Sequence, residues 1–83
     1  MILRFADSHA YPGCRVGLAE AGGDTLAEFS DGSTAPVVAE RQGTGWDIRI
    51  APYRTARGTA IAAANWRLSR VGDGWKVTAR LGG

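Results

Sequence analysis

The segment Arg41-Gln42-Gly43-Thr44-Gly45-Trp46-Asp47-Ile48 returns 29 positions later as Arg70-Val71-Gly72-Asp73-Gly74-Trp75-Lys76-Val77. Both copies follow the pattern Arg-x-Gly-x-Gly-Trp-x and end in a β-branched residue. Glycines between apolar runs are typical of tight turns, whereas aromatic and β-branched residues favour strands. The repeat therefore predicts two equivalent hairpins, in which Trp46 and Trp75 occupy equivalent buried positions. Only the leading Arg41 and Arg70 would then remain free for other contacts.

The register of the second hairpin follows from its alternation of apolar and polar residues. A two-residue loop at Gly72-Asp73 brings only apolar pairs together on one face: Leu68 with Val77, Trp66 with Ala79, and Ala64 with Leu81. A shift by one residue would mix the two faces, which a half-buried sheet does not allow. Glycine at the first loop position also suits a type II′ turn.

The first hairpin has a similar alternation, with Trp46, Ile48 and Ile50 on one face. A loop at Thr44-Gly45 would set Ala39 opposite Ile50 and Glu40 opposite Arg49. The second of these pairs would be a cross-strand ion pair, which contributes at most a few tenths of a kcal/mol.

The whole chain has the spacing of turn residues that is typical of a β protein, since its 12 glycines stand between short apolar runs. We predict a single mainly-β domain over residues 1–83, folded as a small antiparallel barrel or a strongly curved meander sheet of six or seven strands. The expected strands lie near 2–6, 14–21, 25–30, 35–42, 45–51, 59–71 and 74–82.

The segment Thr59–Val71 supports two structures. Its alternation continues across the turn into Trp75, which favours a strand. The run Ala60–Ala64 consists mostly of strong helix formers, with Thr59 as a suitable N-cap and Gly72 as a C′ residue, so the alternative is a helix over Thr59–Val71. A short helix near residues 53–64 is a further possibility. Irregular structure to about Ala62, followed by a strand, is the compromise.

Composition limits the class of protein. The longest apolar run has five residues, and a single cysteine, Cys14, allows no internal disulfide. We see no basic segment followed by an apolar block at the N-terminus, so we expect no signal peptide, no membrane partner and a cytoplasmic location. The net charge of +2 is uneven, at −3 over residues 1–41 and +5 over residues 42–83. The simplest interpretation is that the two halves pair with each other; the alternative is a basic face for an anionic partner.

Two local patterns suggest chemistry only weakly. The loop Asp7–Cys14 holds the only histidine, His9, together with Cys14, which permits an enzyme or a small-ligand site there. It offers too few ligands for a metal, and we expect no metal and no cofactor. The Gly-x-Gly pairs precede strands, whereas phosphate-binding loops precede a helix, so they are turns.

The basic residues of the second half give the better candidate binding site: Tyr53, Arg54, Arg57, Arg67, Arg70, Lys76 and Arg80. Small β barrels bind single-stranded nucleic acids with cationic grooves and aromatic platforms, and Tyr53 could supply such a platform.

Two functions therefore lead. The first is a non-catalytic interaction module that self-associates or binds a protein partner through its sheet. The second is nucleic-acid binding, to a single strand or to RNA, through the arginine-rich face. Catalysis or small-ligand binding by the Asp7–Cys14 loop is the further alternative.

Overall fold

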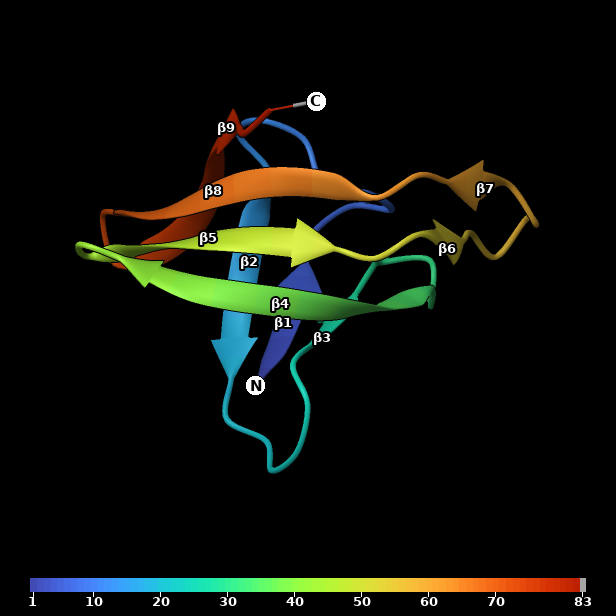
Figure 1. Ribbon diagram of the computed structural model, residues 1–83, viewed down its shortest axis with the longest axis horizontal. Helices are drawn as coiled ribbons and strands as arrows, with labels where there is room; N and C mark the ends of the chain where they lie inside the picture. The colour runs from blue at the N-terminus through green and yellow to red at the C-terminus, as the bar shows by residue number, and fades with distance from the viewer. Residues whose placement is uncertain (83) are drawn as a thin grey trace.

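A computed structural model describes residues 1–82, in which seven strands close into a small barrel (Figure 1). Around the barrel the order is β1-β2-β9-β8-β5-β4-β3. The two remaining strands, β6 and β7, form a ribbon that projects from the β5–β8 connection (Figure 1). The elements are β1 (Ile2–Phe5), β2 (Arg15–Ala19), β3 (Leu26–Glu28), β4 (Thr34–Gln42), β5 (Gly45–Ile50), β6 (Tyr53–Arg54), β7 (Ala60–Ile61), β8 (Ala64–Val71) and β9 (Gly74–Arg80). The predicted small β barrel is confirmed.

The sequence predicts a purely antiparallel barrel, but the observed barrel is mixed. Strands β1 and β3 run parallel, with Ile2 opposite Leu26 and Arg4 opposite Glu28, and every other neighbouring pair is antiparallel. The reason is parity. Strand directions that alternate around a ring can close only when the number of strands is even, so a ring of seven must contain a parallel pair.

The two repeat segments form equivalent hairpins. Gln42 pairs with Gly45 in one and Val71 with Gly74 in the other, which leaves the two-residue loops Gly43-Thr44 and Gly72-Asp73. The first loop residue has a φ of +58° at Gly43 and +65° at Gly72, and no non-glycine residue among 1–82 has a positive φ. This is the pattern of type II′ turns, in which only the first central residue needs glycine.

The predicted register of the first hairpin is therefore wrong by two residues. Val38, not Glu40, lies opposite Arg49, while Glu40 lies opposite Asp47. A two-residue shift keeps every side chain on its face, so the alternation of the sequence did not exclude it. The turn decides the register, because glycine is required at the first loop position.

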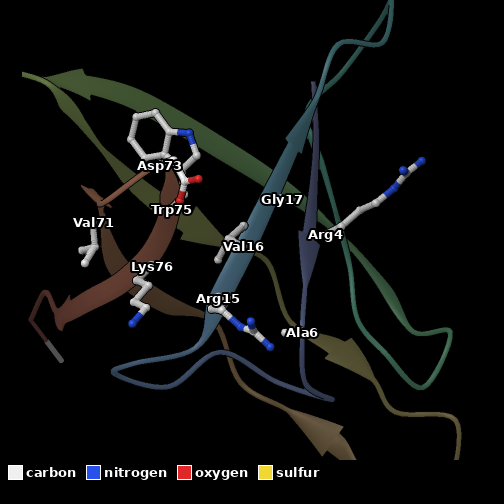
Figure 2. A pocket seen from close by; sticks show the side chains of 10 residues that line it. Arg4, Ala6, Arg15, Val16, Gly17, Val71, Asp73, Trp75 and Lys76 are labelled. Carbon is white, nitrogen blue, oxygen red and sulfur yellow. The ribbon is translucent and has the colours of Figure 1, made fainter.

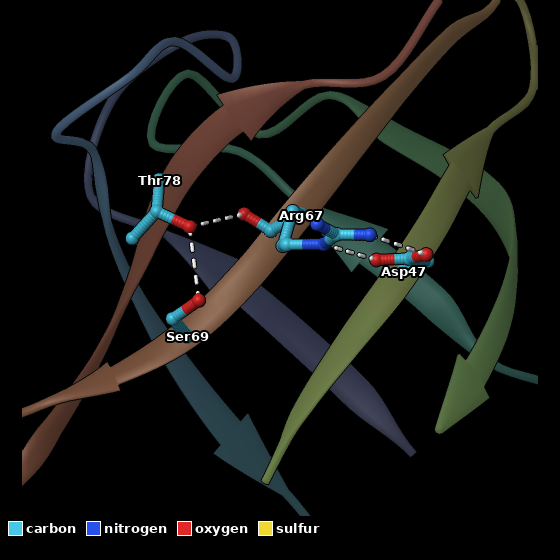
Figure 3. Close-up of polar contacts among 4 residues, drawn as sticks. All are labelled: Asp47, Arg67, Ser69 and Thr78. Atoms are coloured by element: carbon cyan, nitrogen blue, oxygen red, sulfur yellow. Dashed lines mark hydrogen bonds and ion pairs between the residues drawn. The ribbon is translucent and has the colours of Figure 1, made fainter. Parts of the chain in front are cut away.

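In the second hairpin, the predicted pair Leu68–Val77 is confirmed, but a bulge follows it. Arg67 pairs with Ala79 and Trp66 with Arg80, so Thr78 has no partner of its own and the expected pair Trp66–Ala79 does not form. The Thr78 hydroxyl is used locally, since it lies 2.9 Å from the Ser69 hydroxyl and 3.4 Å from the Arg67 carbonyl (Figure 3). Bulges increase the bend of a strand, which helps a short sheet to close.

The segment 53–64 contains no helix within the described residues; it forms the β6–β7 ribbon instead. Gly58 has a φ of +86°, outside the helical region, and its carbonyl accepts a hydrogen bond from Arg54 Nη1 at 2.9 Å. Of the interpretations offered for 59–71, the compromise is closest, because the long strand β8 begins only at Ala64. Residues 1–82 contain no helix with the length and apolar character needed to cross a bilayer.

The core fills the inside of the ring. Leu3, Ile48, Leu68 and Val77 are its largest fully enclosed side chains apart from Cys14, and Trp66 also lies inside. Trp46 and Trp75 pack against this core but remain only partly buried, which corrects the expectation that both are core residues. They lie next to the hairpin turns, at the end of the barrel, where solvent reaches them.

Candidate functional site

The predicted basic face is dispersed over the barrel. Arg67 is already neutralised, since its guanidinium donates to both carboxylate oxygens of Asp47, with Nε–Oδ1 at 2.8 Å and Nη2–Oδ2 at 3.1 Å (Figure 3). The second ion pair among the described residues joins Arg4 to Glu28 at 3.2 Å. Each pair lies within one half of the sequence, so the expected pairing between an acidic and a basic half is not found.

Arg70 and Arg80 lie over tryptophan rings. The Arg70 guanidinium carbon is 5.8 Å from the ring centroid of Trp75, and that of Arg80 is 5.7 Å from Trp66. Arg41 stands in the same way 5.0 Å from the Trp46 ring. In all three cases the two residues are direct cross-strand partners. The arginines of the repeat are therefore not free; each covers the tryptophan of its own hairpin, in an arrangement that favours cation–π attraction.

Tyr53, Arg54 and Arg57 belong to the β6–β7 ribbon and its tip. The Tyr53 ring stacks on Phe29, with centroids 4.5 Å apart and planes 11° apart, so this face of the ring is not an open platform for a base. Burial, with a smaller contribution from the Asp31 carboxylate, raises the pKa of Tyr53 above its usual value. Asp31 also accepts a hydrogen bond from the Ala56 amide at 3.3 Å, which ties the ribbon to the barrel.

A different cationic site lies at the seam between β2 and β9. These strands share only two residue pairs, Arg15–Lys76 and Val16–Trp75, and within the described residues the rest of β2 pairs with β1 alone. The divergence of the strands leaves an open groove of about 450 Å³. It is lined by Arg4, Ala6, Arg15, Val16, Gly17, Val71, Asp73, Gly74, Trp75 and Lys76 (Figure 2).

Arg15 and Lys76 carry the free positive charge of this groove. They are opposite each other on neighbouring strands, and neither forms an ion pair in the part of the chain that the structure describes. Figure 2 shows Arg4 directed away from both, consistent with its ion pair to Glu28. Like charges directly opposite each other destabilise a strand pair. A bound anion between them would remove this repulsion.

Only Lys76 of the groove was among the predicted site residues. The sequence analysis missed Arg15 because its partner strand begins about 60 positions further along the chain. No local pattern in either strand predicts that the two strands pair. Gly17 and Gly74 line the groove and carry no side chains. A Cβ built on Gly74 would have no neighbour within 4 Å, so this part of the surface is open.

The Asp7–Cys14 loop does not bring its reactive residues together in one exposed cluster. Cys14 is 1% exposed, belongs to the core, and has its sulfur 3.5 Å from the Arg15 carbonyl oxygen. His9 is exposed and lies within hydrogen-bonding distance of the Ser8 hydroxyl, at 3.3 Å. The Ser8 amide donates to Asp7 Oδ1 at 2.7 Å, which lowers the pKa of the Asp7 carboxyl. Residues 1–82 hold no cluster of three or more potential metal ligands.

A smaller hollow of about 280 Å³ lies at the end of the barrel near the ribbon, where His9 and Arg80 meet Trp66 and Tyr53. This is the place where a small ligand would fit, as the third alternative from the sequence supposed. Its aromatic rings are engaged, however, because Arg80 covers Trp66 and Phe29 stacks on Tyr53. The β2–β9 groove is larger, and its cations Arg15 and Lys76 form no ion pair among the residues that the structure describes.

The ion pair between Asp47 and Arg67 leads to a testable prediction. Hydrogen bonds from Arg67, helped by its charge, hold the pKa of Asp47 below its ordinary value. Arg67→Gln should therefore raise the pKa of Asp47 toward the usual value of about 3.9, as followed by the carboxyl carbon shift in an NMR titration. A depressed folded-state pKa means that the pair stabilises the fold above pH 4 and loses this contribution as the pH falls through the folded pKa.

The control variant is Arg57→Gln, which removes the same charge from the ribbon tip and should leave the titration of Asp47 in place. An unchanged pKa in Arg67→Gln would mean that the ion pair does not form in solution.

Comparison with known proteins returned no relative: no protein-family model, no curated protein and no solved structure matches this chain.

Proposed function

We propose that this chain is a non-catalytic binding module and that its ligand is a single-stranded nucleic acid held in the β2–β9 groove. The observation that carries the proposal is the pair Arg15–Lys76, two cations at opposite positions of neighbouring strands, on the margin of an open groove that also holds the Asp73 carboxylate. Neither cation forms an ion pair among residues 1–82. The backbone of a nucleic acid offers phosphates at a regular spacing, so one strand could place a phosphate between these two side chains.

The shape of the groove supports a single strand over a compact anion. It is open to solvent and follows the divergence of two strands, so an extended chain can lie along it. Trp75 also lines the groove; because Arg70 lies over its ring, it adds apolar surface to the groove wall and not an open stacking platform. Cationic grooves with aromatic residues are the usual way in which small β domains bind single strands without sequence preference. The sequence ranked self-association first; the groove supports placing nucleic-acid binding ahead of it.

The test is the binding of a fluorescent 15-nucleotide single-stranded DNA, measured by anisotropy at several salt concentrations. Two or three phosphate contacts predict that log K falls with log salt with a slope of about −1.5 to −2. Arg15→Gln and Lys76→Gln should each weaken binding by roughly threefold to tenfold and reduce the slope by about 0.7. Arg57→Gln is the matched control, because it removes one charge outside the groove.

Three results would contradict the proposal. One is the absence of binding at low salt with 100 μM protein. Another is an equal loss of affinity in Arg57→Gln, which would indicate a response to net charge alone. The third is binding of a polyglutamate of similar charge as tight as that of the DNA, because the ligand would then be an acidic polypeptide.

A further inference from the structure

The outer wall of the barrel carries an apolar residue that the fold does not cover. Val38, in the middle of β4, is 65% exposed, the highest value for a large apolar side chain among residues 1–82. Its neighbours in β4, Val37 and Ala39, point inward, as alternation requires. The outward position of Val38 thus follows from the register, and it leaves a branched apolar side chain in solvent.

Two hollows flank this residue. One, of about 340 Å³, includes Leu81; the other, of about 360 Å³, includes Pro36 and Ala63. Val38 and Arg49 line both. The surface around Val38 is therefore a ridge between two shallow depressions with apolar walls, a shape into which the ridge of a second surface can fit.

The charged residues Glu40 and Arg49 beside Val38 have no ion-pair partner among residues 1–82. Glu40 lies two residues along β4 and faces another acid, Asp47, whose two carboxylate oxygens are taken by Arg67. Arg49 lies across from Val38 on β5, with Asn65 on its other side. Neither Glu40 nor Arg49 forms an ion pair within the described residues. One unpaired acid and one unpaired base thus lie on two sides of an exposed apolar residue.

We propose that this face, defined by Val38, Glu40 and Arg49, is the interface of a symmetric homodimer. Glu40 is about 6.7 Å from Val38 along the strand, and Arg49 about 4.8 Å from it across the strands, at a right angle. A two-fold axis through Val38, in the plane of the interface and midway between these two directions, exchanges them. It places Glu40 of each copy over Arg49 of the other and Val38 against its symmetry mate.

This arrangement gives two equivalent ion pairs around an apolar centre and crosses the two sheets at nearly 90°, one of the two common ways in which sheets pack. A second copy is therefore favoured over an unrelated partner, because the charges on this face complement one another under that single operation. The proposal does not depend on the nucleic-acid function. Strand β4 lies three strands from both β2 and β9 around the ring. The β2–β9 groove of each copy would therefore stay open on the outer side of the dimer.

The experiment is sedimentation equilibrium of the purified chain between 1 and 500 μM. We expect a monomer–dimer equilibrium for the native sequence. Glu40→Arg and Arg49→Glu should each weaken dimerisation at least tenfold, because each places like charges together at both pairs. The double variant Glu40→Arg/Arg49→Glu restores opposite charges and should recover dimerisation to within about threefold of the native sequence. Arg57→Glu, away from this face, should dimerise like the native chain.

All variants change exposed residues, so circular dichroism and thermal unfolding should show a native fold in each. A native chain that stays monomeric at 500 μM overturns the proposal. A dimer that is insensitive to both single reversals also overturns it, since the interface must then lie elsewhere, as does a double variant no better than the single ones.

Discussion

Gly45→Ala is expected to lower the free energy of unfolding by about 2–3 kcal/mol, within the range for groups forced into a well-packed interior. Gly45 is buried at the start of β5, and a Cβ at this position would run into the carbonyl oxygen of Leu68 on the neighbouring strand β8. The obstacle is backbone and cannot rotate away as a side chain would. The φ of Gly45 lies outside the left-handed region, so the cost is one of space alone.

The repeat supplies a matched control, Gly74→Ala. Gly74 holds the equivalent position in the second hairpin and also has an ordinary φ, but a Cβ there would have no neighbour within 4 Å. Its effect should stay within about 0.5 kcal/mol. Urea unfolding followed by tryptophan fluorescence measures both. The melting temperature of Gly45→Ala should fall by about 10 °C or more, since 1 kcal/mol corresponds to roughly 4–8 °C in a domain of this size. Equal behaviour of the two variants would show that β5 and β8 do not approach as closely as described.

The difference between these two glycines shows what a repeated motif can predict. The pattern predicts the turns, because Gly43 and Gly72 must both adopt a positive φ, and it predicts the strands that leave them. It does not predict the neighbours on the other side of each strand. Gly45 directly precedes the pair of Trp46 with Leu68 on β8, whereas the pairing of β9 with β2 stops at Trp75, so Gly74 has no partner on β2. The same local sequence is therefore enclosed in one copy and open in the other.

The errors in register have a related cause. Alternation determines which face a residue occupies, but two registers that differ by two residues satisfy it equally well. The first hairpin was predicted with a Thr44-Gly45 loop, which satisfies the alternation but does not use the positive φ that Gly43 adopts at the first loop position. The bulge at Thr78 and the parallel β1–β3 pair arise from closing the ring. Closure is a property of all seven strands together, so no single segment of sequence predicts it.

The candidate groove depends on the same long-range pairing. Lys76 was selected as one of many basic residues, but its significance comes from Arg15, which lies opposite it on β2. Arg67, Arg70 and Arg80 were selected on equal grounds and have partners of their own, Asp47, Trp75 and Trp66. A count of arginines in the sequence thus overestimates the charge available to a ligand. What matters is the charge left without a partner, and this depends on the barrel order.

Leu68→Ala is expected to be the most damaging single change in the core, with a loss of about 2–5 kcal/mol. Leu68 is fully enclosed, lies opposite Trp46 on β5 and Val77 on β9, and borders the bulge in the pairing of β8 with β9. Its side chain thus fills the barrel interior on the central strand of the three neighbours β5, β8 and β9. A chain of this length has a total stability of about 4–12 kcal/mol, so the cavity would remove a large part of it.

Leu26→Ala is the control of identical chemistry, because Leu26 lies on β3 with 38% of its surface already exposed. Its loss should be about 1 kcal/mol or less, since it removes little buried apolar area and leaves no closed cavity. Urea titration of both variants at the same protein concentration compares them directly. Equal midpoints for the two variants would show that the interior at Leu68 collapses to fill the space. In that case the interior beside β5, β8 and β9 would be loosely packed, and Gly45→Ala should then also be tolerated, because both effects require β5 and β8 to be held tightly together.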